Sequence, residues 1–411
     1  MKNIKLLVLT AMSALTLVGC NGGKTGTLPS GGKKVDVTTE EGQATLKEKL
    51  SGVQKAYTAL SFDSASLTST TSGVNLSAKL NAEAENLGKI TLDANLKDLG
   101  AKLEAKVAKH AKGEGEEYDS VDASLSAKTT SGSLSIKGSL PGQKEGETAD
   151  LDASVSLKGL DASAYLSGSK IYGDISASSN DKLVTDIDAF GNTLLGQIKE
   201  SMFGALLPYV LPDGIPEELF NKAELKLTLA EFYSKNVTDK KVFIDMGKPV
   251  EWPAIEQQEE AQQEDDGLGE FVAQIAELAK QNIGFEFKTY SNNAFGFAFA
   301  MSKESLVNLA KANSETEEEG NKNAEQIEKF VSKFTFNADV YFNKNFLLES
   351  AGLSFNADVK LDKSILGDGA ETFTTFDGTV SAKATEKVEL KYGGVKVEFP
   401  SFEDYKELKL F

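Results

Sequence analysis

Apolar and polar residues alternate over much of this chain, and the alternation predicts β-strands. Between residues 62 and 178, and again after residue 284, the chain contains runs in which every second position is apolar, with polar residues between. The clearest runs are 76–82, 151–157, 295–299, 334–342 and 353–361. Successive side chains of a strand point to opposite faces, so these runs predict antiparallel strands with one apolar and one solvated face.

Helical spacing interrupts the alternation. In residues 40–61 an apolar residue recurs at every third or fourth position, which places one apolar stripe along a helix. The stripe consists of Leu46, Leu50, Val53, Tyr57 and Leu60. Further helices are expected within 186–210, within 268–278, at 302–313 and at 321–331. Helices that separate two long runs of strands are typical of an α+β fold.

The first twenty residues have the layout of a secretory signal followed by a lipidation site. Lys2 and Lys5 precede an apolar stretch over residues 6–17, and the small residue Gly19 stands before Cys20. This stretch is shorter than the ~20 apolar residues of a membrane span. The pattern resembles the bacterial lipobox, and the resemblance implies cleavage before Cys20 and attachment of lipid to its thiol. The alternative is a thiol buried at the end of an ordinary signal or membrane helix.

The patterns divide the chain into three regions. These are a signal peptide at 1–19, a lipidated flexible tether at 20–39 and an antiparallel β domain at 40–411. The tether is predicted because Gly, Ser, Thr and Lys predominate there without periodicity. A helical insert occupies about 186–283 of the domain. The segments 40–182 and 284–411 form either one unit or two packed halves.

The charged and reactive residues exclude several functions. The net charge is -18 and all 44 basic residues are lysine, which argues against nucleic-acid binding and against adhesion of the folded body to anionic lipid heads. Cys20 is the only cysteine and His110 the only histidine, so most acid–base, metal and nucleophile sites lack their residues. We therefore expect no enzymatic activity, no cofactor and no metal. The acidic run 256–266 lacks the ligand spacing of a calcium loop and indicates a solvated linker.

The strongest candidate for a ligand-binding segment is an apolar stretch interrupted by prolines, at 203–212, which joins the two sheet regions. Its candidate lid residues are Phe203, Leu206, Leu207, Tyr209 and Leu211. One interpretation is a lid over an apolar groove, and the other is a buried connector.

Phenylalanine is concentrated in the C-terminal half of the chain. Of 23 phenylalanines, only Phe62 precedes Phe190. An aromatic side chain buries about 150–250 Å². The C-terminal half is therefore expected to hold either the tightest core or the largest apolar cavity.

The order of elements and three short segments resemble the lipoprotein-carrier superfamily of the LolA and LppX type. The segments are Ala59-Leu60-Ser61-Phe62, Gly168-Ser169-Lys170-Ile171-Tyr172-Gly173 and Val340-Tyr341-Phe342-Asn343-Lys344-Asn345. The resemblance implies a large, strongly curved antiparallel sheet, an open half-barrel with the N-terminal helix and the helical middle segment on one face. It also implies that a lipid or other apolar molecule binds in the groove of the sheet, which requires no catalytic residue.

The expected function is that of an extracytoplasmic lipoprotein that Cys20 anchors to the cell membrane or outer membrane and that binds an apolar ligand. Its expected partners are the membrane, through the lipid anchor, and a lipid or other apolar small molecule. The alternative is a surface structural or interaction lipoprotein with a packed core and no ligand. Its protein partner is left open by the sequence.

Overall fold

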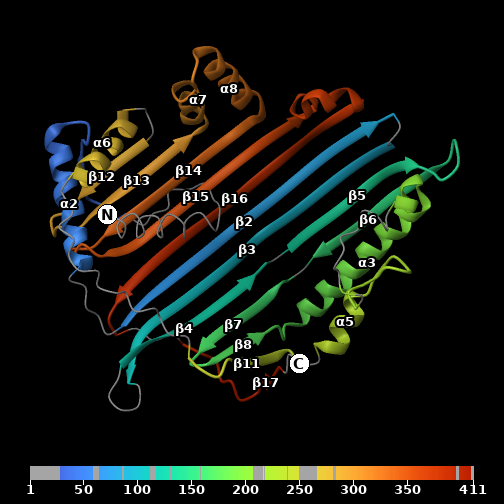
Figure 1. Cartoon of the computed structure of the whole chain (residues 1–411), viewed down its shortest axis with the longest axis horizontal. Helices are drawn as coiled ribbons and strands as arrows, with labels where there is room; N and C mark the ends of the chain where they lie inside the picture. The colour runs from blue at the N-terminus through green and yellow to red at the C-terminus, as the bar shows by residue number, and fades with distance from the viewer. Residues whose placement is uncertain are drawn as a thin grey trace.

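A mostly antiparallel sheet of fifteen strands forms the frame of the molecule in the part of the chain that the structure describes (Figure 1). The computed structural model describes residues 28–58, 64–85, 88–111, 117–129, 131–157, 159–206, 216, 218–237, 239–249, 266–280, 284–394 and 398–408. The first strands of the sheet are β1 (Lys33–Val35), β2 (Ser64–Ala84), β3 (Gly88–Ala111), β4 (Glu117–Lys128), β5 (Ser131–Pro141), β6 (Thr148–Leu157), β7 (Asp161–Ser167) and β8 (Lys170–Asp174). The others are β11 (Lys241–Asp245), β12 (Gly284–Thr289), β13 (Phe295–Ser302), β14 (Val331–Phe342), β15 (Leu348–Asp362), β16 (Thr375–Tyr392) and β17 (Lys406–Glu407).

Six α-helices and a few smaller elements accompany the sheet in these residues. The α-helices are α2 (Glu40–Thr58), α3 (Ser178–Glu200), α5 (Leu229–Asn236), α6 (Asp266–Lys280), α7 (Lys303–Ala312) and α8 (Glu317–Phe330). The smaller elements are the 3-10 helices η2 (Met202–Leu206) and η3 (Lys363–Thr372) and a separate two-stranded pair, β9 (Phe220–Asn221) with β10 (Lys226–Leu227).

Two unusually long strands occupy the centre of the sheet. β2 has 21 residues and β3 has 24, so at roughly 3.3 Å per residue they extend over about 70 and 80 Å. β4 pairs with one half of β3 and β5 with the other, and β6 and β7 repeat this arrangement one position further out. Thr129 lies between β4 and β5 and bonds to the chain on both sides. Its hydroxyl donates to the carbonyl of Lys97 in β3, and its N–H donates to the carbonyl of Leu160, which lies between β6 and β7.

Helix α3 lies beside β6, where the edge of the sheet would otherwise be open. β8 follows β7 along its edge, and the chain then continues as α3 instead of as a strand. Both amide atoms of the Gln197 side chain bond to the backbone of Asp152 in β6, at 3.0 and 3.2 Å. The helix thus occupies hydrogen-bonding groups that a second chain would otherwise pair with.

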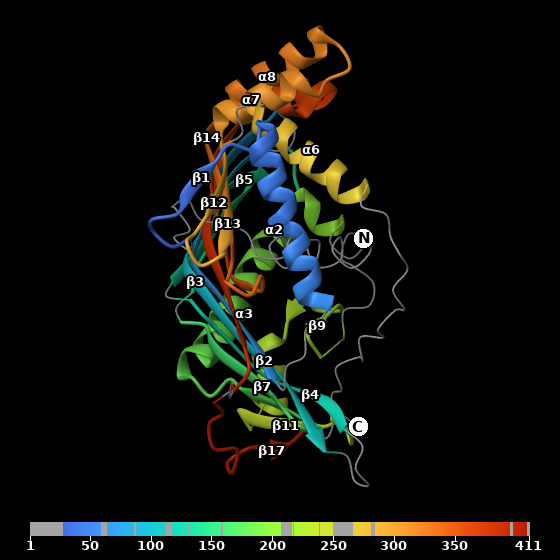
Figure 2. The same ribbon diagram turned by 90° about the vertical axis from the view of Figure 1, so that its left-hand side faces the viewer.

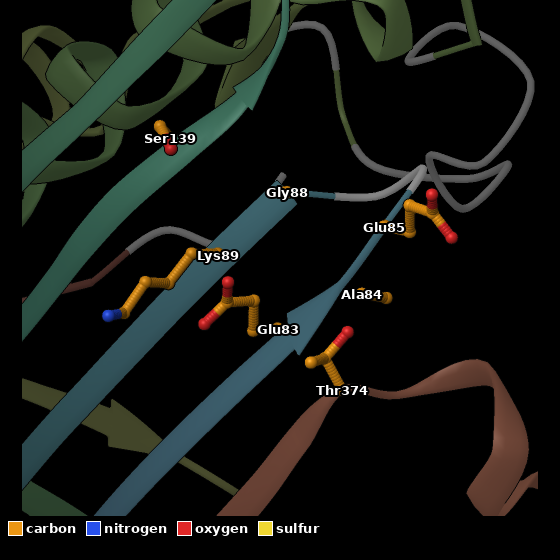
Figure 3. A pocket seen from close by; sticks show the side chains of 7 residues that line it. All are labelled: Glu83, Ala84, Glu85, Gly88, Lys89, Ser139 and Thr374. Carbon is orange, nitrogen blue, oxygen red and sulfur yellow. The ribbon is translucent and has the colours of Figure 1, made fainter.

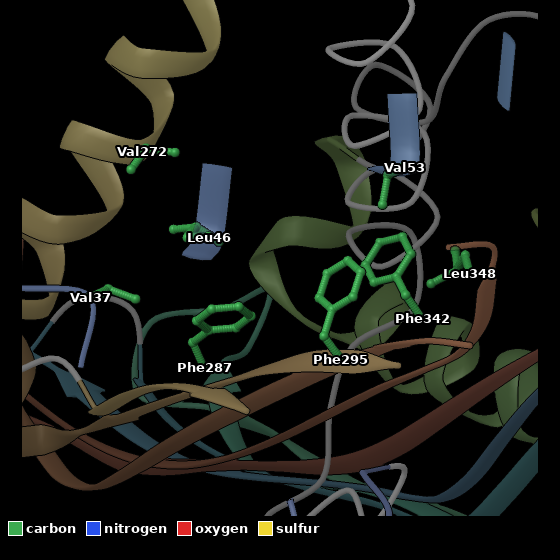
Figure 4. Packing of buried hydrophobic residues seen from close by; sticks show 8 residues of the cluster. All are labelled: Val37, Leu46, Val53, Val272, Phe287, Phe295, Phe342 and Leu348. Atoms are coloured by element: carbon green, nitrogen blue, oxygen red, sulfur yellow. The ribbon is translucent and has the colours of Figure 1, made fainter. Parts of the chain in front are cut away.

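The apolar face of the sheet is packed at both lateral ends. At one end α2 and α6 pack against β12 to β14, in a cluster where Leu46, Phe287 and Phe295 are fully buried (Figures 2 and 4). At the other end, beside α3, the residues of β6 that face the core are buried. These are Ala149, Leu151, Ala153 and Val155. Several phenylalanines of the C-terminal half therefore belong to a tightly packed core.

The C-terminal segment packs on the opposite face of the sheet. Tyr172 of β8 stacks on Phe402, with ring centroids 3.7 Å apart, and Tyr165 and Tyr405 lie at the margin of the same cluster. β17 then pairs with β11 in parallel. This aromatic packing holds the end of the described chain against an otherwise polar face.

The structure confirms the α+β class and the antiparallel sheet, whereas the expected strong curvature is absent. The sheet is neither closed nor strongly curled, and its outermost strands, β1 and β17, lie at opposite ends of the strand order. Helices α2 and α6 pack at one lateral end and α3 at the other, so the described part of the sheet does not wrap around a central helix. An open half-barrel is therefore not what these residues form.

β2 pairs with β16 from Ala65 to Glu83, so the segments 40–182 and 284–411, whose division the sequence left open, share one continuous sheet. Two further features differ from the sequence expectations. Residues 33–35, expected in the tether, form β1 because Val35 packs against the phenylalanine cluster. The segment expected to be a helical insert contains β11, which pairs with β8. Among the described residues, no helix is both long and apolar enough to cross a membrane.

Candidate functional site

Apolar side chains remain exposed in the middle of the apolar face, between its two packed ends. We call these residues the central apolar strip. It consists of Val380 on β16, Leu76 on β2, Leu103 on β3, Leu125 on β4 and Ile171 on β8. Each keeps 36–46% of its surface exposed. Large exposed apolar patches mark interaction sites in soluble proteins.

The strand register places these side chains on one face. Leu76 pairs with Ala382, two positions from Val380, and Leu103 pairs with Leu125. Ser69 of β2 pairs with Leu103, and Leu76 lies further along the same strand, so the two pairs share a face at different points along the strands. β2 contains a bulge near Gly73. The extra residue there shifts the positions on the apolar face from odd numbers before the bulge to even numbers after it.

One carboxyl group interrupts the apolar face. Glu386 of β16 is only 3% exposed, and its direct neighbours across the strands are Leu353 and Thr71. Oε1 accepts a hydrogen bond of 2.8 Å from the hydroxyl of Ser69. Oε2 is buried and has no hydrogen-bond partner among the described residues. Burial raises the pKa of Glu386, because an apolar environment disfavours the charged carboxylate.

The opposite face of the central strands is polar. Lys79 and Asp93 pair across β2 and β3 at 3.3 Å, and Lys137 and Asp152 pair across β5 and β6 at 3.2 Å. Exposed pairs of this kind contribute little to stability. Their effect is to keep one face wet while the other presents leucine and valine.

The structure also contains a polar hollow of about 340 Å³ at the turn between β2 and β3 (Figure 3). Its lining residues are Glu83, Ala84, Glu85, Gly88, Lys89, Ser139 and Thr374. A neighbouring hollow shares Glu83 and Lys89 with it. Neither has the lining of an apolar groove. No group of His, Cys, Asp and Glu in the described residues is arranged to hold a metal ion.

The residues selected from the sequence lie partly outside the described chain. Cys20, Leu207, Tyr209 and Leu211 are in this category. Phe203 and the backbone of Leu206 belong to η2, directly after α3. Phe203 is half-buried, and its N–H donates to the hydroxyl of Ser201, a residue that bridges to Gly142 near the β5–β6 turn. The lid therefore stays a prediction.

Sequence reasoning missed Glu386 and the central apolar strip. A signal for Glu386 exists, because the even positions from 380 to 390 are Val, Ala, Ala, Glu, Val and Leu. A single acid in an apolar series indicates a carboxyl on the apolar face. The exposure of the strip has no such signal, since it depends on where the helices pack.

Comparison with known proteins finds no family model that matches this chain and no similar curated protein. The resemblance to the lipoprotein-carrier superfamily therefore remains a sequence-based expectation.

Proposed function

We propose that this protein is an extracytoplasmic lipoprotein, held at a bacterial membrane by lipidated Cys20, that binds a lipid or other apolar molecule on the central apolar strip. The observation that supports the proposal most is the exposure of Leu76, Leu103 and Leu125 on the face that elsewhere forms the core. Covering such side chains gains roughly 25 cal/mol per Å² of apolar surface. This gain requires no catalytic residue.

The arrangement supports a ligand that lies along the sheet and is not fully enclosed. The strip crosses several neighbouring strands, which stand about 4.8 Å apart, so it offers an extended apolar surface. An acyl chain or a similar molecule matches this shape.

A second candidate is an interaction lipoprotein whose strip is covered by a protein. The polar lining of the two hollows in the described residues favours it, because neither hollow suits an enclosed apolar ligand. The two candidates differ in whether lipid accompanies the purified protein.

The test is extraction of the mature chain, made with Cys20→Ser, followed by mass spectrometry and by titration with a neutral dye that fluoresces in apolar surroundings. We expect stoichiometric lipid or saturable dye binding. Leu125→Asp should weaken dye binding at least about 10-fold, because the burial of one leucine is worth about 1.5–3 kcal/mol. Ser126→Asp is the matched control, since the adjacent exposed residue lies on the polar face. A clean extract without saturable dye binding would reject the ligand proposal.

A further inference from the structure

Glu386 is a buried acid for which the described part of the chain supplies only half of the expected hydrogen bonding. Carboxylate oxygens are strong acceptors, and a buried polar atom is normally paired. Ser69 satisfies Oε1, whereas Oε2 is buried without a partner among the described residues. Leaving such a group unpaired costs stability. Burial that brings Oε2 no compensating contact among the described residues points to a contact with another molecule.

The carboxyl group lies next to the central apolar strip. The β16 alternation places Glu386 on the same face as Val380, and Ser69 pairs with Leu103 in β3. Ser69 thus contacts the acid and also neighbours an exposed residue of the strip. An apolar chain lying over Leu103 and Leu125 would have its end on β3, two strands from the acid, with Ser69 of β2 between them.

The charges around the strip favour a cationic head group over an anionic one. In β16, Lys383 and Lys387 occupy odd positions and therefore lie on the polar face, away from Glu386. The chain has no arginine and a net charge of -18. It therefore lacks the residue that best holds carboxylate or phosphate, and its overall field attracts cations.

We infer that the central apolar strip binds an amphiphile that has a long apolar chain and an amine head group, and that Glu386 receives the amine at Oε2. This inference rests on the proposed function and specifies the class of ligand. The apolar chain would cover the strip. The side chains that bury Oε2 would move aside, and the amine would donate the hydrogen bond that Oε2 lacks. Hydrogen bonds to a charged group contribute about 1.5–3 kcal/mol.

The experiment compares a primary alkylamine, an alcohol and a carboxylate of equal chain length, each below its micelle-forming concentration. Each compound displaces the neutral dye from the mature chain with Cys20→Ser. We expect the amine to bind about 10- to 100-fold more tightly than the alcohol, and the carboxylate to bind most weakly. In Glu386→Gln the preference for the amine should disappear, while binding of the alcohol is kept.

Glu389→Gln is the matched control, because Glu389 belongs to the same strand but pairs with Lys387 on the polar face. It should retain the preference for the amine. Glu386→Leu provides a second variant without the carboxyl if the amide prevents folding. Equal binding of amine and alcohol by the wild type, or an amine preference that survives in both Glu386 variants, would overturn this inference while the proposed function stands. If none of the three compounds displaces the dye, this inference fails as well, whereas the proposed function fails only when the extract is clean and the dye itself does not bind saturably.

Discussion

The hydroxyl of Ser69 in β2 donates a hydrogen bond of 2.8 Å to Oε1 of Glu386 in β16, although 317 positions separate the two residues in the chain. The bond joins the first long strand to the last one, at the point where the N-terminal and C-terminal parts of the sheet meet. Because it lies on the apolar face, the bond also orients the one acid among the apolar residues of β16. Under the inference above, stability and ligand choice depend on the same side chain.

Replacing Glu386 should reveal the cost of its burial. The pKa of Glu386 is raised above its ordinary value of 4.5 by burial, so the folded state favours the protonated form. The favourable contribution is fully present below pH 4.5 and is lost as the pH rises through the folded-state pKa. Glu386→Gln should therefore be more stable than the wild type at pH 7, by on the order of 1 kcal/mol.

Urea unfolding at several pH values measures this difference. The advantage of Glu386→Gln should shrink as the pH falls to 4.5 and below. Glu389→Gln, on the polar face, should show no such gain at pH 7. A gain of equal size at every pH would contradict the assigned cause.

Gln197 should protect the exposed edge of β6. Gln197→Ala removes two hydrogen bonds to the backbone of Asp152, each worth about 0.5–1.5 kcal/mol. We expect a total loss of about 1–3 kcal/mol and faster hydrogen exchange of the Asp152 amide. Thr193→Ala, which alters an exposed position of the same helix, should change stability by less than about 0.5 kcal/mol. Unchanged exchange at Asp152 would show that α3 does not cap the edge.

Protonation of Asp362, the residue that precedes η3, should lower the stability of the folded protein in acid. The Ser364 hydroxyl, followed by the Lys329 ammonium and the Ser364 N–H, lowers the pKa of Asp362 to about 2. The stabilising contribution is present above the ordinary value of 3.8 and is lost as the pH falls toward 2. Asp362→Asn should thus unfold at lower urea concentration than the wild type at pH 7, and the two proteins should converge near pH 2. Midpoints that differ equally at both pH values would refute this linkage.

Cys20 should determine where the protein is found. A single acyl chain binds membranes only marginally, whereas two or more chains anchor a protein stably. Cys20→Ala should therefore move the protein out of the membrane fraction or block its processing. Fractionation and the mass of the mature chain measure both effects. If neither changes, the thiol carries no anchor.

Local periodicity explains which elements the sequence predicted well. The apolar stripe predicted within residues 40–61 corresponds to α2 as far as Thr58, and its last member, Leu60, lies outside the described residues. The two alternating runs at 334–342 and 353–361 correspond to β14 and β15. A stripe or an alternation depends on neighbouring residues alone, so it is visible without the fold. By contrast, β11 escaped prediction because five residues within a helical region give too short a pattern.

The sequence by itself determined the α+β class, the two-faced strands, the absence of arginine and the lipobox-like start. Only the tertiary structure decided that β2 pairs with β16, that the sheet stays uncurled, and that Leu103 and Leu125 remain exposed. It also decided that Glu386 is buried beside Ser69. The reason is that the period of a strand specifies which face a side chain occupies, whereas its strand partners and its cover are set by contacts between residues hundreds of positions apart.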